Sequence, residues 1–288
     1  MSETRTSAPA SGALVLVATP IGNLGDLSPR AVATLAGADA VCCEDTRHTG
    51  KLLELAGVRA RRLVSLHAHN EAARVDELLA QLRSGATVAL VSDAGTPLVS
   101  DPGERLVAAA IAAGVFVSAV PGPSAALTAL VVSGLDVGRW RFEGFLPRKG
   151  PERRERIAQI AAAPVPTVCY EAPPRLAGTL AELAGSCGEQ RRVAVARELT
   201  KLHEEVWRTT LGEAARRAAS HEARGEHVLV VDGASEAPAP GRDALRDALA
   251  RLAAAGLSRR DAVRAAEVLL GARHRDAYDA ALEVFAAP

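Results

Sequence analysis

The stretch ALVSDAGTPLVSDPGERLV, residues 89–107, joins a buried strand to a helix through a long loop. The apolar run before the loop predicts a strand over Thr87–Val91, and the residues after it predict a helix over Pro102–Ala113. The loop is dense in glycine and proline and carries two carboxylates, Asp93 and Asp101. A plain strand-to-helix connection is usually shorter. Such a loop presents backbone N–H and C=O groups to a ligand, so it predicts a binding site.

The same alternation of short apolar runs and amphipathic stretches extends along the first half of the chain. This order predicts an α/β domain whose mainly parallel sheet is covered by helices on both faces. Two helix starts are predicted, one at Ser28 with Pro29 and the other at Asn70. Ala73 is expected on the apolar face of the helix that begins at Asn70. The remaining predicted strands are Leu14–Ala18, Ala38–Cys43, Leu63–Leu66 and Val115–Val120, and the remaining helices are Ser28–Ala36, His48–Ala56 and Asn70–Leu82.

Pro121-Gly122-Pro123 interrupts this rhythm, and a second α/β unit follows. We therefore predict a disordered tail over 1–12, domains over 13–121 and 122–233, a linker over 234–241 and a helical extension over 242–288. The strands expected in the second domain are Arg141–Phe145, Thr167–Tyr170, Val193–Arg197, Glu205–Thr209 and His227–Val231. The helices expected from here on are Ala125–Val132, Glu152–Ala162, Leu176–Ala184, Gly212–Ala219, Asp243–Ala255, Arg259–Leu270 and Asp276–Phe285.

The composition excludes several classes of protein. The 34 basic and 34 acidic residues balance, so no global field attracts nucleic acid or membrane, and aromatics at 3% argue against a stacking platform for bases. The four cysteines form no C-x-x-C pair and indicate reduced thiols in the cytoplasm. No signal-peptide core and no apolar run of membrane-spanning length is present.

Three further loops follow predicted strands, at the sheet edge where ligands bind in open α/β folds. TPIGNLGD (19–26) is neither G-x-G-x-x-G nor a P-loop, and a simple turn is the alternative. EDTRH (44–48) is a candidate site, or else Asp45 or Thr46 caps a helix while Arg47 pairs with Glu44. PGPSA (121–125) feeds a helix N-terminus that suits an anionic group, or it is a domain hinge.

Two polar clusters remain ambiguous in the sequence. His67 and His69 could bind a metal, but no third ligand is evident, and a polar strand end is the favoured explanation. A basic run is either a solvated helix face or a patch that contacts RNA phosphates. Its candidate RNA-binding residues are Arg148, Lys149, Arg153 and Arg154, and Arg156 belongs to the same run.

Taken in order along the chain, these loops resemble one family closely, the 16S ribosomal RNA cytidine 2′-O-methyltransferases of the tetrapyrrole-methylase superfamily. Pro174 stands where many relatives carry His. The Ser258–Ala280 region is similar to the family's helical extension. The matching blocks are ATPIGNLGDLSPRA (18–31), CEDTRHTGKLL (43–53), SLHAHNE (65–71), ALVSDAGTPLVSDPGERLV (89–107), VPGPSAALTAL (120–130), FEGFLPRKG (142–150), YEAPPRL (170–176) and ARELTKLHEEVWR (196–208).

The resemblance implies two α/β domains with S-adenosylmethionine in the cleft between them. It implies a cytidine ribose of small-subunit ribosomal RNA as the substrate, within the assembled 30S subunit, and a cytoplasmic homodimer. A small-molecule methylase of the same superfamily and a non-catalytic RNA-binding module are the alternatives. The cofactor-binding residues that the resemblance implies are Pro20, Asp93, Ala94, Gly95, Thr96, Ser124, Ala125 and Tyr170.

The chemistry of the expected reaction needs alignment of the two reactants and a proton acceptor, and no metal. A carboxylate that accepts the hydroxyl proton contributes about 10²–10⁴-fold. Glu44, Asp45 and Asp101 are the candidates, with Glu198 behind them, and the sequence does not rank them. Arg47 and Lys201 are candidates for positioning phosphate or the acidic residues.

Overall fold

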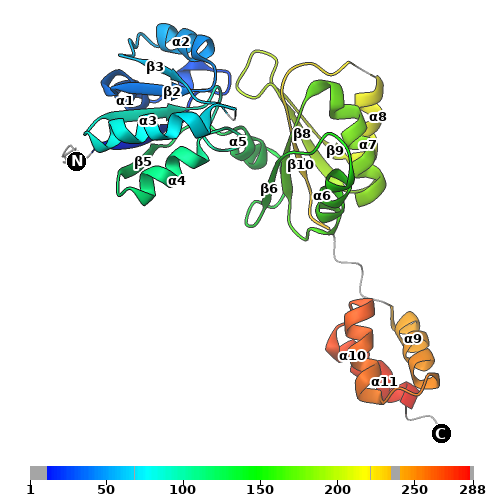
Figure 1. Cartoon of the computed structure of the whole chain (residues 1–288). Helices are drawn as coiled ribbons and strands as arrows, with labels where there is room; N and C mark the ends of the chain where they lie inside the picture. Colours follow the sequence, from blue (N-terminus) through cyan, green and yellow to red (C-terminus); the bar gives the residue numbers. More distant parts are fainter. Residues whose placement is uncertain (1–11, 68, 221, 235–240, 286–288) are drawn as a thin grey trace, which may run out of the picture. The chain divides into compact units, whose positions relative to one another are not determined.

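A computed structural model describes residues 12–67, 69–220, 222–234 and 241–285 (Figure 1). The chain divides into two compact units, 1–233 and 234–288. Nearly all of the predicted tail 1–12 and linker 234–241 lies outside the described residues. Within the described ranges, no helix has the length and apolar character needed to cross a membrane.

The first sheet is entirely parallel, as the sequence predicts, in the order β3-β2-β4-β1-β5. Adjacent cysteines Cys42 and Cys43 belong to the two hydrophobic clusters on its opposite faces, because neighbouring strand residues point to opposite sides. The strands are β1 (Ala13–Val17), β2 (Ala40–Cys43), β3 (Leu63–Ser65), β4 (Thr87–Val91) and β5 (Phe116–Val120), with helices α1 (Pro29–Gly37), α2 (Thr46–Leu55), α3 (Glu71–Arg83) and α4 (Glu104–Ala112), and a short 3₁₀ turn η1 (Leu24–Asp26).

Helix starts in this domain follow the sequence with one correction. Ser28 Oγ accepts a hydrogen bond from Ala31 N at 3.1 Å, with Pro29 at the first helical position, as predicted. Asn70 occupies the N-cap position of α3, as predicted, but its side chain makes no capping hydrogen bond, because Oδ1 accepts from His67 N and the amide donates to Ser65 O. Ala73 is exposed, so its expected apolar contact is also absent.

The second sheet is mixed, in the order β6-β7-β10-β8-β9. Only β6 and β7 run parallel, and the other neighbours are antiparallel. The strands are β6 (Arg141–Phe145), β7 (Thr167–Glu171), β8 (Arg192–Arg197), β9 (Glu205–Thr210) and β10 (His227–Val231), with helices α5 (Ala125–Val132), α6 (Pro151–Ala162), α7 (Leu176–Cys187) and α8 (Leu211–Ser220), and a 3₁₀ turn η2 (Pro173–Arg175).

Helix α5 packs on β7 and β10 of the second sheet, and Figure 1 shows it between the two α/β domains. Its hydrophobic cluster includes Ile21, which comes from the loop after β1. The other three helices cover the opposite face of the second sheet. The predicted fold class is therefore confirmed for the main unit, and α5 links the core of one domain to a loop of the other.

The C-terminal unit consists of three helices, α9 (Arg242–Ala254), α10 (Arg259–Leu270) and α11 (His274–Phe285), around their own small core. Ser258 caps α10 by accepting a hydrogen bond from Asp261 N at 3.2 Å, as its sequence predicts. Gly271 ends the same helix in the left-handed conformation. The fold-class prediction of a helical extension is confirmed.

Candidate functional site

The loop after β4 and the start of α5 line a cavity of about 250 Å³. Every predicted cofactor-binding residue except Pro20 lines it. Pro20 lines an adjoining cavity of about 320 Å³, which shares Ile21, Asp93 and Ala94 with the first. The full lining of the first cavity is Ile21, Asp93, Ala94, Gly95, Thr96, Val99, Ser100, Asp101, Ser124, Ala125, Phe145, Tyr170, Glu171, Glu226, His227 and Val228.

Hydrogen bonds between three loops fix the shape of this cavity. Thr19 and Gly95 exchange two backbone hydrogen bonds, of 2.9 and 3.1 Å. Thr96 Oγ1 donates to Pro123 O at 3.1 Å, which ties the β4 loop to the entry of α5. Gly95 has φ +85°, and a Cβ there would lie 3.3 Å from Ile21 Cγ2. Because this backbone and space favour glycine, the site is preorganised before any ligand arrives.

Two residues in the same loop store backbone strain beside the cavity. Leu98 and Ser100 have φ values of 71° and 72°, a region that non-glycine residues adopt rarely. Strain of this kind persists only where surrounding contacts enforce it, and it gathers at functional sites. The strained segment leads directly into Asp101, which lines the cavity.

Asp101 has the properties expected of a general base. Burial, followed by the charges of Glu44 and Asp93, raises the pKa of Asp101 to about 6. A base works best when its pKa lies near the operating pH, because it is then ionised yet still takes up a proton. The structure thus brings Asp93, Asp101 and Glu44 close enough to interact, from loops after two neighbouring strands, β4 and β2.

Asp45 occupies a different environment, as the N-cap of α2. Its Oδ1 accepts a hydrogen bond from Arg47 N at 2.8 Å, and its own N–H donates to Asp93 Oδ1 at 3.3 Å. Hydrogen bonds from Arg47 lower the pKa of Asp45. The alternative that Asp45 caps a helix is confirmed. The expected pairing of Arg47 with Glu44 is wrong, because the Arg47 guanidinium lies 3.5 Å from Asp45 instead.

The basic run divides into exposed and buried members. Arg148, Lys149 and Arg154 are exposed, and their contact with RNA stays a prediction. The prediction for Arg153 is wrong. Its side chain is 8% exposed and bonds to Glu182, Thr179 Oγ1 and Pro147 O, all within 2.9 Å. Arg153 therefore holds α6 against α7 and is not available to phosphate.

Several residues that line the first cavity were not predicted from the sequence, among them Glu171, His227 and Phe145. Glu171 is buried and held by Arg175, Thr179 and the Ala172 N–H. Its place in the YEAPPRL block was the signal that could have found it. Phe145 lies in the FEGFLPRKG block and had the same kind of signal. His227 had none, because it begins a strand whose sequence is otherwise ordinary.

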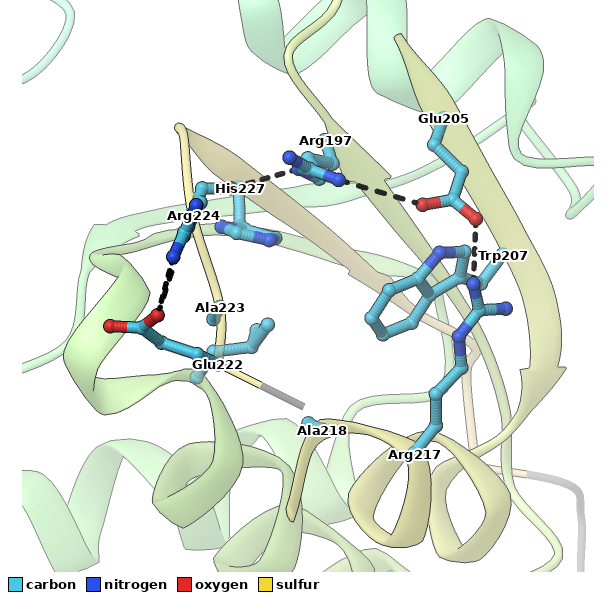
Figure 2. A pocket seen from close by; sticks show the side chains of 10 residues that line it. Arg197, Glu205, Trp207, Arg217, Ala218, Glu222, Ala223, Arg224 and His227 are labelled. Carbon is cyan, nitrogen blue, oxygen red and sulfur yellow. Dashed lines mark hydrogen bonds and ion pairs between the residues drawn. The ribbon is translucent and has the colours of Figure 1, made fainter. Parts of the chain in front are cut away.

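A larger cavity of about 490 Å³ lies beside β9 and α8, and Figure 2 shows its lining. The Arg217 guanidinium lies 4.0 Å from the Trp207 ring centroid and 2.6 Å from Glu205. Arg224 pairs with Glu222 at 2.9 Å. None of the four glycine- and carboxylate-bearing loops described above lines it. Both of its carboxylates are paired with arginines, so it is the weaker candidate for chemistry.

A two-domain α/β fold with such a loop-lined cavity is the architecture of a methylase class, and the chain belongs to the tetrapyrrole (corrin/porphyrin) methylase family, whose model matches residues 13–215. Relatives named ribosomal RNA small subunit methyltransferase I are similar over nearly the whole length. The Mycobacterium tuberculosis protein is 48% identical, with 95% of each chain covered. The Synechocystis protein is 45% identical, covering 95% of this chain and 98% of its own. The Escherichia coli O157:H7 protein is 43% identical, covering 98% and 99%.

Solved structures show the same fold at lower identity. Uroporphyrin-III C-methyl transferase from Thermus thermophilus, complexed with S-adenyl homocysteine, has a TM-score of 0.55 at 20% identity, covering 77% of this chain and 97% of its own. Diphthine synthase has a TM-score of 0.58 at 18% identity, covering 77% and 90%. The family resemblance drawn from the sequence motifs is confirmed, and S-adenosylmethionine as the cofactor agrees with it.

Proposed function

We propose that this chain transfers a methyl group from S-adenosylmethionine to the ribose 2′-hydroxyl of a cytidine in small-subunit ribosomal RNA. The names of its full-length relatives support a small-subunit ribosomal RNA substrate. The observation that carries the reaction is Asp101, a carboxylate with a pKa raised to about 6 on the wall of the loop-lined cavity.

The cavity residues suit S-adenosylmethionine. The Asp93–Thr96 loop and the start of α5 at Ser124–Ala125 offer backbone polar groups, and Gly95 keeps the loop free of a side chain where it approaches Ile21. Tyr170 closes the wall, and burial raises the pKa of its phenol, so Tyr170 stays neutral at physiological pH. When bound, S-adenosylmethionine supplies an electrophilic methyl on its sulfonium, so the chain must mainly align the acceptor.

Asp101 would accept the proton of the 2′-hydroxyl as the hydroxyl oxygen takes the methyl group that S-adenosylmethionine would supply. The transfer balances, because the positive charge lost from the methyl donor is matched by neutralisation of the carboxylate. Asp101 is favoured over Asp45, which caps a helix and has a lowered pKa. It is favoured over Glu198, whose carboxylate is held by Lys201 at 2.9 Å. Glu44 and Asp93 act through Asp101 by raising its pKa.

The rest of the proposal concerns recognition of the substrate. Exposed Arg148, Lys149 and Arg154 would contact phosphates, a role that their exposure and charge permit. Attack by a 2′-hydroxyl also restricts the enzyme to RNA. The resemblance of the motifs supports the assembled 30S subunit as the substrate and a cytoplasmic homodimer as the working form.

The test is transfer of radiolabelled methyl from S-adenosylmethionine to small ribosomal subunits that lack their native methylation. Nuclease digestion then identifies the labelled nucleoside. We expect label on the 2′-oxygen of a cytidine. Label on a base or another nucleoside would refute the proposed acceptor. No label, with cofactor binding seen by calorimetry, would favour a small-molecule acceptor for the same fold.

A further inference from the structure

A β-bulge in β6 places two phenylalanines on one face of the second sheet. The register between β6 and β7 pairs Phe142 with Val168, Gly144 with Cys169, and Phe145 with Tyr170, and it shifts between Phe142 and Gly144. Phe142 and Phe145 are three residues apart, so on a regular strand their side chains would point to opposite faces of the sheet. The bulge adds one residue to β6, so both phenylalanines point to the same face. This is the face that α5 covers, because their partners Val168 and Tyr170 both belong to the hydrophobic cluster of α5.

Charge and conformation hold this bulge in place. Glu143, the bulged residue, has a buried carboxylate bonded by Arg141 at 2.8 Å and by Arg156 at 2.5 Å. Gly144 has φ +61°, and a Cβ there would lie 3.0 Å from Ser100 Oγ. The bulge therefore contacts the strained loop that leads into Asp101, and bulges of this kind re-aim side chains next to active sites.

The two phenylalanines remain open to solvent. They flank Tyr170, with ring centroids 5.2 Å from it for Phe142 and 5.3 Å for Phe145. Neither ring stacks flat on Tyr170, since the interplanar angles are 73° and 59°. Phe142 is 36% and Phe145 56% exposed. Helix α5 packs on β7 and β10, whereas β6 is the edge strand of the sheet.

Exposed aromatic rings beside a reactive carboxylate suggest a ligand with a flat apolar face. Phe145 lines the same cavity as Asp101. Arg148 and Lys149 follow it closely in the chain and are exposed. A nucleotide combines the three matching features: a base for the rings, a ribose hydroxyl for the carboxylate, and phosphates for the cations.

We propose that Phe142 and Phe145 form a stacking platform for the base of the nucleotide whose ribose is methylated. This inference rests on the proposed function and adds how the acceptor is held. It departs from the expectation that the low aromatic content argues against a stacking platform. Two of the four phenylalanines and one of the two tyrosines in the chain gather at this one place.

The test compares Phe145→Leu with Phe145→Tyr, using methyl transfer to unmethylated small subunits. Leucine keeps most of the apolar volume but has no π face, whereas tyrosine keeps the ring. We expect Phe145→Leu to lower kcat/KM by roughly 5- to 150-fold, mainly through KM, and tyrosine to restore it to within about threefold of the parent. Phe142→Leu should act in the same direction with a smaller effect.

Phe116→Leu is the matched control, because Phe116 is 54% exposed at the start of β5, far along that strand from the loop that enters α5. It should leave kcat/KM unchanged. Calorimetry with S-adenosylmethionine should give a dissociation constant within about twofold of the parent for every variant, and this also shows that each one folds.

Several results would overturn the platform. The platform would be refuted if Phe145→Leu kept full activity, or if Phe145→Tyr and Phe145→Leu lost activity equally. It would also be refuted if the loss of activity followed weakened cofactor binding. Failure of the parent protein to label any ribosomal cytidine would instead refute the proposed function. The two failures are therefore distinguishable. If Phe145→Leu does not fold, Phe142→Leu against Phe142→Tyr gives the same comparison.

Discussion

The largest cavity of the main unit and the cavity that contains Asp101 differ in how their charged groups are satisfied. Around the larger one, Glu205 pairs with Arg217 at 2.6 Å and Glu222 with Arg224 at 2.9 Å (Figure 2). In the smaller one, Asp101 faces other carboxylates, and its pKa is raised to about 6. Volume alone would select the larger cavity, which is not the site that we propose. An acidic group held among like charges beside a strained loop identifies the site better.

The largest effect that we predict is the loss of activity when the Asp101 carboxylate is replaced. Asp101→Asn removes the proton acceptor and should lower kcat for methyl transfer about 10²–10⁴-fold with little change in cofactor affinity. The measurements are steady-state methylation of small subunits and calorimetry with S-adenosylmethionine. Asp45→Asn is the matched control, because Asp45 caps α2 and does not line the cavity. If Asp45→Asn lowered kcat as much as Asp101→Asn, the assignment of Asp101 rather than Asp45 as the proton acceptor would be wrong.

Arg153 is a buried cation whose hydrogen-bond partners are Glu182, Thr179 and Pro147, so its replacement should affect stability. Arg153→Ala breaks its contacts with Glu182, Thr179 and Pro147 O and should lower the free energy of unfolding by about 3 kcal/mol. Arg154→Ala, at an exposed neighbouring position, should change stability by less than about 0.5 kcal/mol. Urea unfolding measures both. If Arg153→Ala were as stable as Arg154→Ala, the buried network would not hold α6.

Asp101 should also reduce stability where it is ionised. Its raised pKa means that the folded state binds the proton more tightly than the unfolded chain does. Ionisation therefore costs folding free energy as the pH rises from about 4 through about 6. Asp101→Asn should thus be more stable than the parent at pH 8, by roughly 1–2 kcal/mol after allowance for solvent screening. The gain should vanish below pH 4. A pH-independent gain would contradict this origin.

The smallest expected effect lies at the larger cavity. Glu205→Gln weakens a partly exposed ion pair with Arg217, so the free energy of unfolding should fall by less than about 1 kcal/mol. Methyl transfer should stay within about twofold of the parent, because the proposed reaction takes place in the other cavity. Thermal unfolding and the methylation assay provide the measurements. A loss of activity comparable to that of Asp101→Asn would reverse our ranking of the two cavities.

The sequence predicted those features that depend on local chemistry. Ser28 and Asp45 cap helices as short polar side chains do, and apolar periodicity located the strands. The family resemblance implied the candidate cofactor-binding residues. All but Pro20 line one cavity, and most of them lie in loops after parallel strands, which share one edge of the sheet.

What the sequence could not show depends on contacts between distant segments. Arg153 resembles its neighbours in the basic run, and only packing of α6 against α7 buries it. The three candidate carboxylates could not be ranked, because the pKa of Asp101 depends on burial and on Glu44 from another strand. The register shift in β6 that gathers Phe142 and Phe145 depends on pairing with β7. The antiparallel order of the second sheet likewise arises from pairing.

The most direct test of the central claim is the pH dependence of single-turnover methyl transfer with saturating cofactor and small subunits. For the parent protein, we expect the rate to rise with pH through about 6 and to level off above it, as Asp101 loses its proton. The Asp101→Asn variant should be slow and show no such rise. Full rate in the variant, or the same titration with the amide in place, would show that Asp101 is not the base.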